Sequence, residues 1–210
     1  MIPTESMAGF IIASTLLSFS PGPDNIFVLS QSALNGRKTG ILITLGLCTG
    51  LIFHTAIVAL GIAAIIKTSA VAFTLLKFLG AMYLCFLAWS AFNSSYQNLK
   101  SYQSPKLSYK QLYRRGVFMN ITNPKVSLFF LAFLPQFTAP SQGDLTLQIF
   151  TLGALFMLTA LIVFSSIAVL ASSLGSYLKK NKSAQTYLNR ITTIVFILLA
   201  IKLVLYEVNI

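Results

Sequence analysis

Histidine, acidic residues and cysteine are scarce in this chain of 210 residues. It contains one His, four Asp and Glu residues together, and two cysteines, Cys48 and Cys85. The sequence has no tract rich in His, Asp and Glu, no G-x-S-x-G or H-E-x-x-H motif, and no P-loop. Two cysteines are too few for a disulfide framework, and their spacing is not that of paired metal ligands. We therefore expect a protein that is not an enzyme, binds no cofactor or metal, and does not use ATP.

Charge of either sign is also scarce, whereas apolar residues are abundant. Charged residues make up 9% of the chain and hydrophobic residues 56%, with a mean hydropathy of +0.79. Soluble domains carry roughly 25% charged residues, and a membrane-spanning helix needs about 20 mostly apolar ones. Apolar runs without charge recur at Ser6–Pro23, Thr39–Ile66, Phe78–Leu99, Val126–Gly143 and Leu145–Leu178. This pattern predicts an all-α polytopic membrane protein that lies in the lipid bilayer.

These runs predict six transmembrane helices. The first run follows Glu5 without a basic segment or a clear cleavage site, so it is not expected to be a signal peptide. The expected helices are Met7–Leu34, Gly40–Ile66, Val71–Phe92, Gly116–Phe137, Leu147–Ser172 and Ile191–Tyr206.

The basic residues predict the orientation of these helices. Of the fifteen Lys and Arg residues, only two are assigned to the even-numbered loops between the predicted helices, Lys67 and Lys77. The odd-numbered loops hold Arg37, Lys38, Lys100, Lys106, Lys110, Arg114, Arg115, Lys179, Lys180, Lys182 and Arg190. Because basic loops stay in the cytoplasm, both termini are predicted to be periplasmic. The basic residues separate apolar runs instead of gathering on one amphipathic face, so the net charge of +11 does not indicate nucleic-acid binding.

Two of the predicted helices contain residues that break helices. The first contains SFSPGPDNIF, and the fourth contains ITNPKVSLFF. Pro23-Asp24 and Pro124-Lys125 lie 101 residues apart, so the two breaks are in register. A cut near residue 105 gives two halves, 1–105 and 106–210, of three spans each. An odd number of spans per half predicts two inverted repeats, in which paired breaks indicate the substrate site. The alternative is that each proline only kinks its helix for packing.

Each break carries one charge, Asp24 or Lys125. A charge near the bilayer centre costs about 2.5–3.5 kcal/mol, which makes it a candidate functional residue. Asp24 suits the positive end of a helix that restarts at Pro23, so it can also be read as a helix-start residue. Lys125 opposes the same dipole, so a partner is expected for it: either Asp24 or a bound anion.

The single histidine, His54, lies on one helical face with Gly46, Gly50 and Gly61. Small residues allow a neighbouring helix to approach closely. We expect His54 to act as a proton relay or to hold a hydrogen bond within that interface. Lys202, late in the last span, is expected to extend to the membrane interface.

A membrane thiol–disulfide electron carrier is the rival interpretation, because such proteins can also have six spans in two inverted halves. It would require a cysteine in each half, near the breaks. Cys48 and Cys85 both fall in the first half, away from Pro21–Pro23, and are better interpreted as packing residues.

Several short motifs occur in order along nearly the whole chain. They are Ser20-Pro-Gly-Pro-Asp24, Gly36…Gly40, Gly46…Gly50…His54, Leu79-Gly-Ala-Met-Tyr-Leu84 and Gly116…Asn120…Asn123-Pro-Lys…Phe129-Phe130…Pro135-Gln-Phe137. Together they resemble the lysine-exporter (LysE/RhtB-type) translocator family. The last span, Leu199-Ala-Ile-Lys-Leu203, departs from the glycine-and-arginine pattern of that family, so no role is implied for Lys202.

The resemblance implies an exporter of amino acids or close derivatives in a bacterial inner membrane, driven by the proton or membrane potential and able to form a homodimer. Export of another small solute is the alternative. We expect Asp24 to bind the substrate ammonium and to exchange it for a proton, with His54 as a possible second relay residue. Lys125 is expected to bind the carboxylate, and to pair with Asp24 when the site is empty. The expected translocation residues are Pro21, Gly22, Pro23, Asp24, Asn25, Asn120, Thr122, Asn123, Pro124 and Lys125.

Overall fold

The structure, a computed structural model, describes residues 2–62, 70–93, 107–180 and 182–205. Within these residues all regular secondary structure is helical, as predicted. The elements are α1 (Thr4–Phe19), α2 (Pro23–Asn35), α3 (Arg37–Ile57), the π-helix η1 (Val58–Ile62), α5 (Ala70–Phe92), α6 (Tyr109–Ile121), α7 (Pro124–Leu128), the π-helix η3 (Phe129–Phe133), the 3₁₀-helices η4 (Leu134–Phe137) and η5 (Pro140–Gln142), α8 (Leu145–Lys180) and α9 (Lys182–Leu205).

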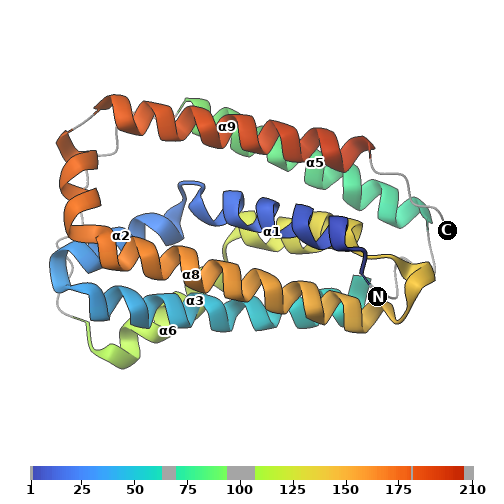
Figure 1. The fold of residues 1–210 in the computed structure, drawn as a ribbon, viewed down its shortest axis with the longest axis horizontal. Coiled ribbons are helices and arrows are strands. Elements are labelled where there is room, and N and C mark those ends of the chain that lie inside the picture. The colour runs from blue at the N-terminus through green and yellow to red at the C-terminus, as the bar shows by residue number, and fades with distance from the viewer. Residues whose placement is uncertain (1, 63–69, 94–106, 181, 206–210) are drawn as a thin grey trace.

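The helices run back and forth along one long axis. In Figure 1, α1 and α2 run from right to left and α3 returns beside α8. The start of α1 and the end of α9 lie at the same end of the molecule. The turn from α2 to α3 lies at the opposite end, where Gly36 has a φ of +88°, a value that favours glycine. Arg37 and Lys38 follow directly, so they lie at the end remote from the termini.

Two interruptions divide helices near the middle of the molecule. α1 ends at Phe19 and α2 begins at Pro23, with Gly22 as the N-cap. The segments 109–121 and 124–137 are bent by 47° at their break, and Pro124 is the first residue after it. Proline has no N–H to continue a helix but suits the first helical position. The prolines therefore explain why each helix restarts where it does.

The helices extend further than the predicted spans. α6 begins at Tyr109 instead of Gly116, because Ser108 and Gln111 form a capping box there. α8 continues to Lys180, and α9 begins at Lys182 instead of Ile191. The expected loop residues Lys110, Arg114, Arg115 and Arg190 are thus helical. The predicted boundaries were wrong here because hydropathy marks only the apolar part of a helix. The expected division near residue 105 lies outside the described residues.

Length and composition identify some of the described helices as able to cross a membrane. Two helical segments pass this test, residues 37–61 and 145–171, and a third passes if the bent pair is one span. Large apolar side chains are exposed along several helices, among them Ile12, Leu60, Trp89 and Phe118. Apolar surface on this scale suits lipid contact. These observations fit a multi-pass membrane protein, and the full arrangement of six spans stays a prediction.

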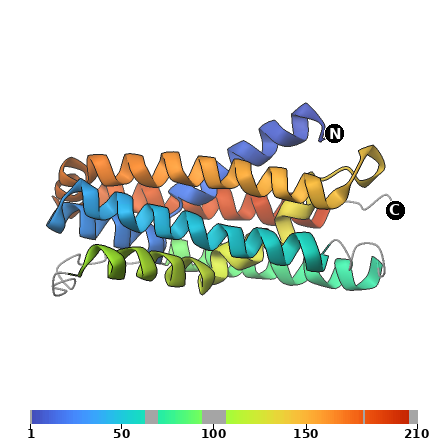
Figure 2. The same cartoon turned by 90° about the horizontal axis from the view of Figure 1, so that it is seen from below.

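Glycines bring α3 and α6 into close contact, as predicted for the face of α3 that carries His54. A Cβ at Gly46 would collide with the Tyr113 carbonyl oxygen and lie 3.1 Å from the Gly116 Cα. A Cβ at Gly50 would lie 2.7 Å from the Asn120 side chain. A Cβ added at Gly61 would have no neighbouring atom within 4 Å, so the prediction that Gly61 lies in this interface was wrong. Figure 2 shows α6 along one side of α3 and α8 along the other.

Aromatic rings fill the interior between the breaks and the end of the molecule that carries the start of α1. The cluster contains Phe10 of α1, four rings of the fourth predicted span and Phe156 of α8. Their ring centroids lie 5.0–6.4 Å apart. The four rings are those of Phe129, Phe130, Phe133 and Phe137. The protein therefore has a dry, packed layer on this side of the breaks.

Candidate functional site

The two breaks touch each other through their polar residues. Asn123, the N-cap of α7, donates from Nδ2 to Asp24 Oδ2 at 2.8 Å. Asp24 lies in the first turn of α2 and is 2% exposed. The Asn123 Oδ1 accepts from the Lys125 backbone N–H at 3.0 Å, so the same side chain also caps α7. Asn123 thus joins the start of α7 to the start of α2.

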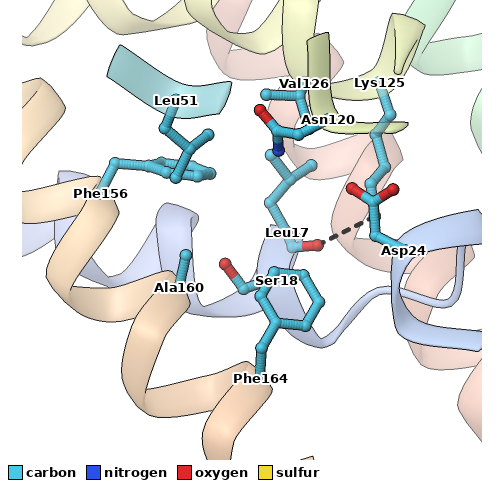
Figure 3. Close-up of a pocket in the computed structure, with 10 residues that line it drawn as sticks. All are labelled: Leu17, Ser18, Asp24, Leu51, Asn120, Lys125, Val126, Phe156, Ala160 and Phe164. Atoms are coloured by element: carbon cyan, nitrogen blue, oxygen red, sulfur yellow. Dashed lines mark hydrogen bonds between the residues drawn. The ribbon is translucent and has the colours of Figure 1, made fainter. Parts of the chain in front are cut away.

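Lys125 contacts the other side of the first break. Its Nζ donates to the backbone carbonyl oxygens of Ser20 at 3.0 Å and Leu17 at 3.3 Å, and Figure 3 shows the second of these bonds. These carbonyls lie at the C-terminal end of α1, where backbone acceptors lack helical partners and the helix dipole favours a cation. A Cβ at Gly22 would lie 3.1 Å from the ammonium nitrogen, so glycine leaves room for it. In the described residues the ammonium therefore binds carbonyls, and the expected Asp24–Lys125 pair is not formed.

Several buried oxygen atoms around the breaks have no protein hydrogen-bond partner. Asn25 donates from Nδ2 to the Ser18 carbonyl oxygen at 2.7 Å, which leaves its Oδ1 unpaired. The unpaired atoms near the breaks are Asp24 Oδ1, Asn25 Oδ1, Asn120 Oδ1 and the hydroxyls of Ser14, Ser18 and Ser20. Each buried polar group without a partner costs about 1–3 kcal/mol. A concentration of unpaired buried oxygens such as this one is typical of a place where a protein binds a ligand, an ion or water.

A small pocket opens among these residues. Ser18, Asp24 and Asn120 surround it together with apolar side chains of α1, α3 and α8 (Figure 3). Its volume is about 10 Å³, roughly the space that one water molecule needs. The pocket in this structure is therefore too small to hold an amino acid. The lining residues are Leu17, Ser18, Asp24, Leu51, Asn120, Lys125, Val126, Phe156, Ala160 and Phe164.

The structure brings most, but not all, of the expected site residues together. Asp24, Asn25, Asn120, Asn123 and Lys125 are buried at the breaks, and Gly22 is half-buried beside them.

The remaining expected residues lie outside this buried group. Pro21, Pro23 and Pro124 are exposed and shape the backbone. Thr122 is also exposed, and its hydroxyl bonds to the Phe118 carbonyl of its own helix. Its side chain therefore does not share the buried position of Asn120 and Asn123.

The sequence interpretation did not include the serines of α1 or the α8 wall of the pocket. Ser14 and Ser18 lie four residues apart, just before the first break, which places them on one helical face. Phe156, Ala160 and Phe164 repeat the same spacing on α8. Regular spacing was the available signal, but it does not show which face of a membrane helix meets the site.

His54 is buried beside the second break. Its Nε2 lies 3.1 Å from the Asn120 carbonyl oxygen, so a proton on this nitrogen is donated to that carbonyl. The ring also lies against Phe53 and Phe130, with centroids 6.0 and 5.7 Å away. His54 therefore satisfies a carbonyl at the end of α6, as the packing interpretation expects, and the relay role stays a prediction.

Replacing His54 separates these two roles. We expect His54→Gln to keep a donor for the Asn120 carbonyl, so the protein accumulates normally and retains transport. His54→Phe leaves that carbonyl unpaired, at a cost of about 1–3 kcal/mol, and should lower the protein level. Immunoblotting of membranes and a transport assay measure both effects. Normal accumulation of His54→Gln with no transport would instead indicate a proton relay.

The remaining candidates lie away from this site. Cys48 is buried on α3 and Cys85 is exposed on α5, and both are free thiols. Lys202 is exposed, with its Nζ 4.1 Å from the centre of the Phe137 ring. Within the described ranges, no three His, Cys, Asp or Glu side chains are grouped to hold a metal.

Apolar helices and two interruptions that meet beside a small pocket define a helical membrane protein. Comparison with known proteins identifies its family. Residues 15–207 match the model of the LysE type translocator family, and the chain belongs to that family. It is therefore a transporter and not an enzyme, which excludes the electron-carrier interpretation.

Three relatives show how far the similarity extends. A Bacillus subtilis protein described as "Uncharacterized membrane protein YrhP" is 30% identical over 94% of this chain and 98% of its own. The "Homoserine/homoserine lactone efflux protein" of Salmonella typhimurium is 33% identical over 82% of this chain and 84% of its own. A membrane protein of Vibrio cholerae is 31% identical over 87% and 88% of the two chains. No solved structure matches.

Proposed function

We propose that this transporter exports a small amino acid or a close derivative from the cytoplasm, through a site centred on Asp24. The observation that carries the proposal is the Asp24 carboxylate itself. It is buried where two helix breaks meet, and its Oδ1 faces no protein donor. A buried carboxylate is stabilised by a positively charged partner or by a proton. The ammonium group that amino acids share supplies such a partner.

The relatives support a neutral substrate of small size. The Salmonella typhimurium relative is named for efflux of homoserine and homoserine lactone. Asp24 is the only buried acid in the described part of the chain. A basic amino acid such as lysine would bring a second cation into the pocket, and that cation would have no carboxylate to pair with. We therefore place homoserine and other neutral amino acids ahead of basic ones, with export of another small solute as the alternative.

An efflux assay tests this function. Cells that lack the protein and cells that produce it are loaded with single labelled amino acids, and the label released to the medium is followed. We expect the protein to accelerate release of homoserine and similar neutral amino acids, and not of lysine. Equal release from both cell types across a broad panel would contradict the proposal.

Coupling to protons is the second element of the proposal. Asp24 would carry a proton during the return step, when no substrate ammonium balances its charge, with His54 as a second candidate in the relay. This exchange keeps the buried carboxylate from being left unpaired in the membrane. Proteoliposomes with an imposed pH gradient should therefore drive homoserine against its concentration gradient, and a protonophore should abolish that accumulation.

We further propose two inverted repeats, 1–105 and 106–210, in a bacterial inner membrane. The contacts support this arrangement: α1 and α2 pack on α8 as α6 packs on α3, while α3 pairs with α8 and α5 with α9. A two-fold axis in the membrane plane exchanges the members of these pairs. Association into a homodimer is also part of the proposal.

Reporter fusions test this topology. We expect a fusion after Asn209 to report the periplasm and one within 100–110 to report the cytoplasm, because most basic residues fall in the odd-numbered loops. Arg37 and Lys38 lie at the end remote from the start of α1, which supports this orientation. A cytoplasmic carboxyl terminus would contradict both the orientation and the inverted repeat.

A further inference from the structure

We propose that this site recognises only the ammonium end of its substrate, and that Lys125 holds the end of α1 in place instead of binding the substrate carboxylate. This inference rests on the proposed function and specifies which chemical group of the substrate the site selects. Small primary amines whose carboxyl group is masked, as in an amide, would then be substrates as good as the free amino acid.

The first argument is the balance of donors and acceptors. The six buried side-chain atoms left unpaired around the breaks are one carboxylate oxygen, two amide oxygens and three serine hydroxyls, and all six can accept a hydrogen bond. The side-chain nitrogens of Asn25, Asn123 and His54 already bind protein oxygens. A site with spare acceptors fits a ligand with several N–H donors, and an ammonium group has three. A carboxylate could accept only from the three serine hydroxyls among these atoms, because the carboxylate and amide oxygens cannot donate.

The second argument is the position of Lys125. Its ammonium binds two carbonyl oxygens at the end of α1, at 3.0 and 3.3 Å, where it completes the helix end and interacts favourably with the helix dipole. These bonds use two of the three N–H groups of Lys125. If the ammonium moved away to a substrate carboxylate, the buried carbonyls of Leu17 and Ser20 would be left unpaired. The same contact positions Ser18 and Ser20, two of the residues with unpaired hydroxyls.

The third argument concerns the helix starts, which are the other source of positive potential for an anion. The first turn of α2 already carries the Asp24 carboxylate, which would repel a second one. At the start of α7, the Lys125 N–H is bound to Asn123 Oδ1, and the next two N–H groups bind the Asn123 carbonyl. Neither helix start is therefore free to hold the carboxylate of a substrate.

Exchange in proteoliposomes tests this inference with purified full-length protein. Uptake of labelled L-homoserine in exchange for internal L-homoserine is measured while unlabelled L-homoserine, L-homoserine amide or N-acetyl-L-homoserine competes from the same side as the label. The amide keeps the ammonium and lacks the carboxylate, whereas the N-acetyl compound does the reverse. We expect the amide to compete as well as homoserine, and the N-acetyl compound at least about tenfold more weakly, since a charge-assisted bond is lost. An amide that competes tenfold more weakly than homoserine overturns the inference while the exporter function stands. Absence of any homoserine exchange overturns both.

Lys125→Gln provides a second readout, with Lys77→Gln as a matched control. Lys77 also donates to a helix-end carbonyl, that of Val204 at 3.2 Å, but on α5. We expect Lys125→Gln to weaken competition by homoserine and its amide by the same factor, and Lys77→Gln to change neither. If Lys125→Gln weakens competition by homoserine but not by its amide, Lys125 binds the substrate carboxylate and the inference is overturned. If Lys125→Gln does not accumulate, competition by homoserine and by its amide in the wild-type protein still tests the inference.

Discussion

Asp24→Asn is expected to abolish export while the protein still accumulates in the membrane. The Asn side chain keeps an oxygen for the Asn123 amide, which bonds Asp24 at 2.8 Å. It removes the charge that the proposed substrate ammonium and the returning proton both require. Hydrogen bonds to charged groups contribute about 1.5–3 kcal/mol, which corresponds to a loss of at least about tenfold in transport. Efflux of labelled homoserine, normalised to the protein level in membranes, measures the effect.

Glu5→Gln is the matched control, because Glu5 lies in the first turn of α1 and is exposed. It should export at the wild-type rate. A double variant, Asp24→Asn with Lys125→Gln, distinguishes a site from a structural charge pair. We expect it to remain inactive. Recovery of transport in the double variant would show that the two charges only stabilise each other, and would contradict a substrate site at Asp24.

Gly46→Ala is expected to have the second-largest effect, because it disturbs the packing of α3 against α6. It does not change a residue of the proposed substrate site. The added methyl group would collide with the Tyr113 carbonyl oxygen and approach the Gly116 Cα at 3.1 Å. These are backbone atoms, so no rotamer change relieves the contact, and α3 and α6 must move apart. Overpacking of this kind costs about 1–3 kcal/mol. The separation would also displace His54 and Asn120, which join the same two helices.

Gly61→Ala is the matched control for this substitution, because a Cβ at Gly61 meets nothing within 4 Å. We expect the thermal stability of the purified Gly46→Ala protein to fall well below that of the wild type, and that of Gly61→Ala to stay unchanged. Equal stability of the two variants would show that α3 and α6 do not cross closely at Gly46.

The helix breaks around the proposed site could be predicted from the sequence because they depend on local backbone chemistry. Proline favours the first position of a helix in any protein, so Pro23 and Pro124 indicate where helices restart. A charged residue beside each proline is conspicuous in an apolar chain. The glycine face of α3 was equally readable, since a spacing of four places Gly46 and Gly50 on one side. These features depend on a few neighbouring residues, which is why the pattern alone indicated them.

The partners of these residues depend on tertiary packing and were not readable in the same way. Lys125 was expected to meet an acid or an anion, whereas it completes the end of α1, which lies more than a hundred residues earlier. The α8 wall of the pocket follows from how α8 crosses α1 and α3. Helix ends were also misplaced, because hydropathy reports the apolar length and the capping residues Ser108 and Gln111 extend α6 beyond it.

Equilibrium binding of labelled homoserine to the purified protein tests most directly whether Asp24 forms the substrate site. The measurement compares wild type, Glu5→Gln and Asp24→Asn in detergent, with homoserine amide as a competitor. We expect wild type and Glu5→Gln to bind equally, and Asp24→Asn to bind at least about tenfold more weakly because the charge-assisted bond is lost. Equal binding by a folded Asp24→Asn protein would contradict the proposed site between the two helix breaks.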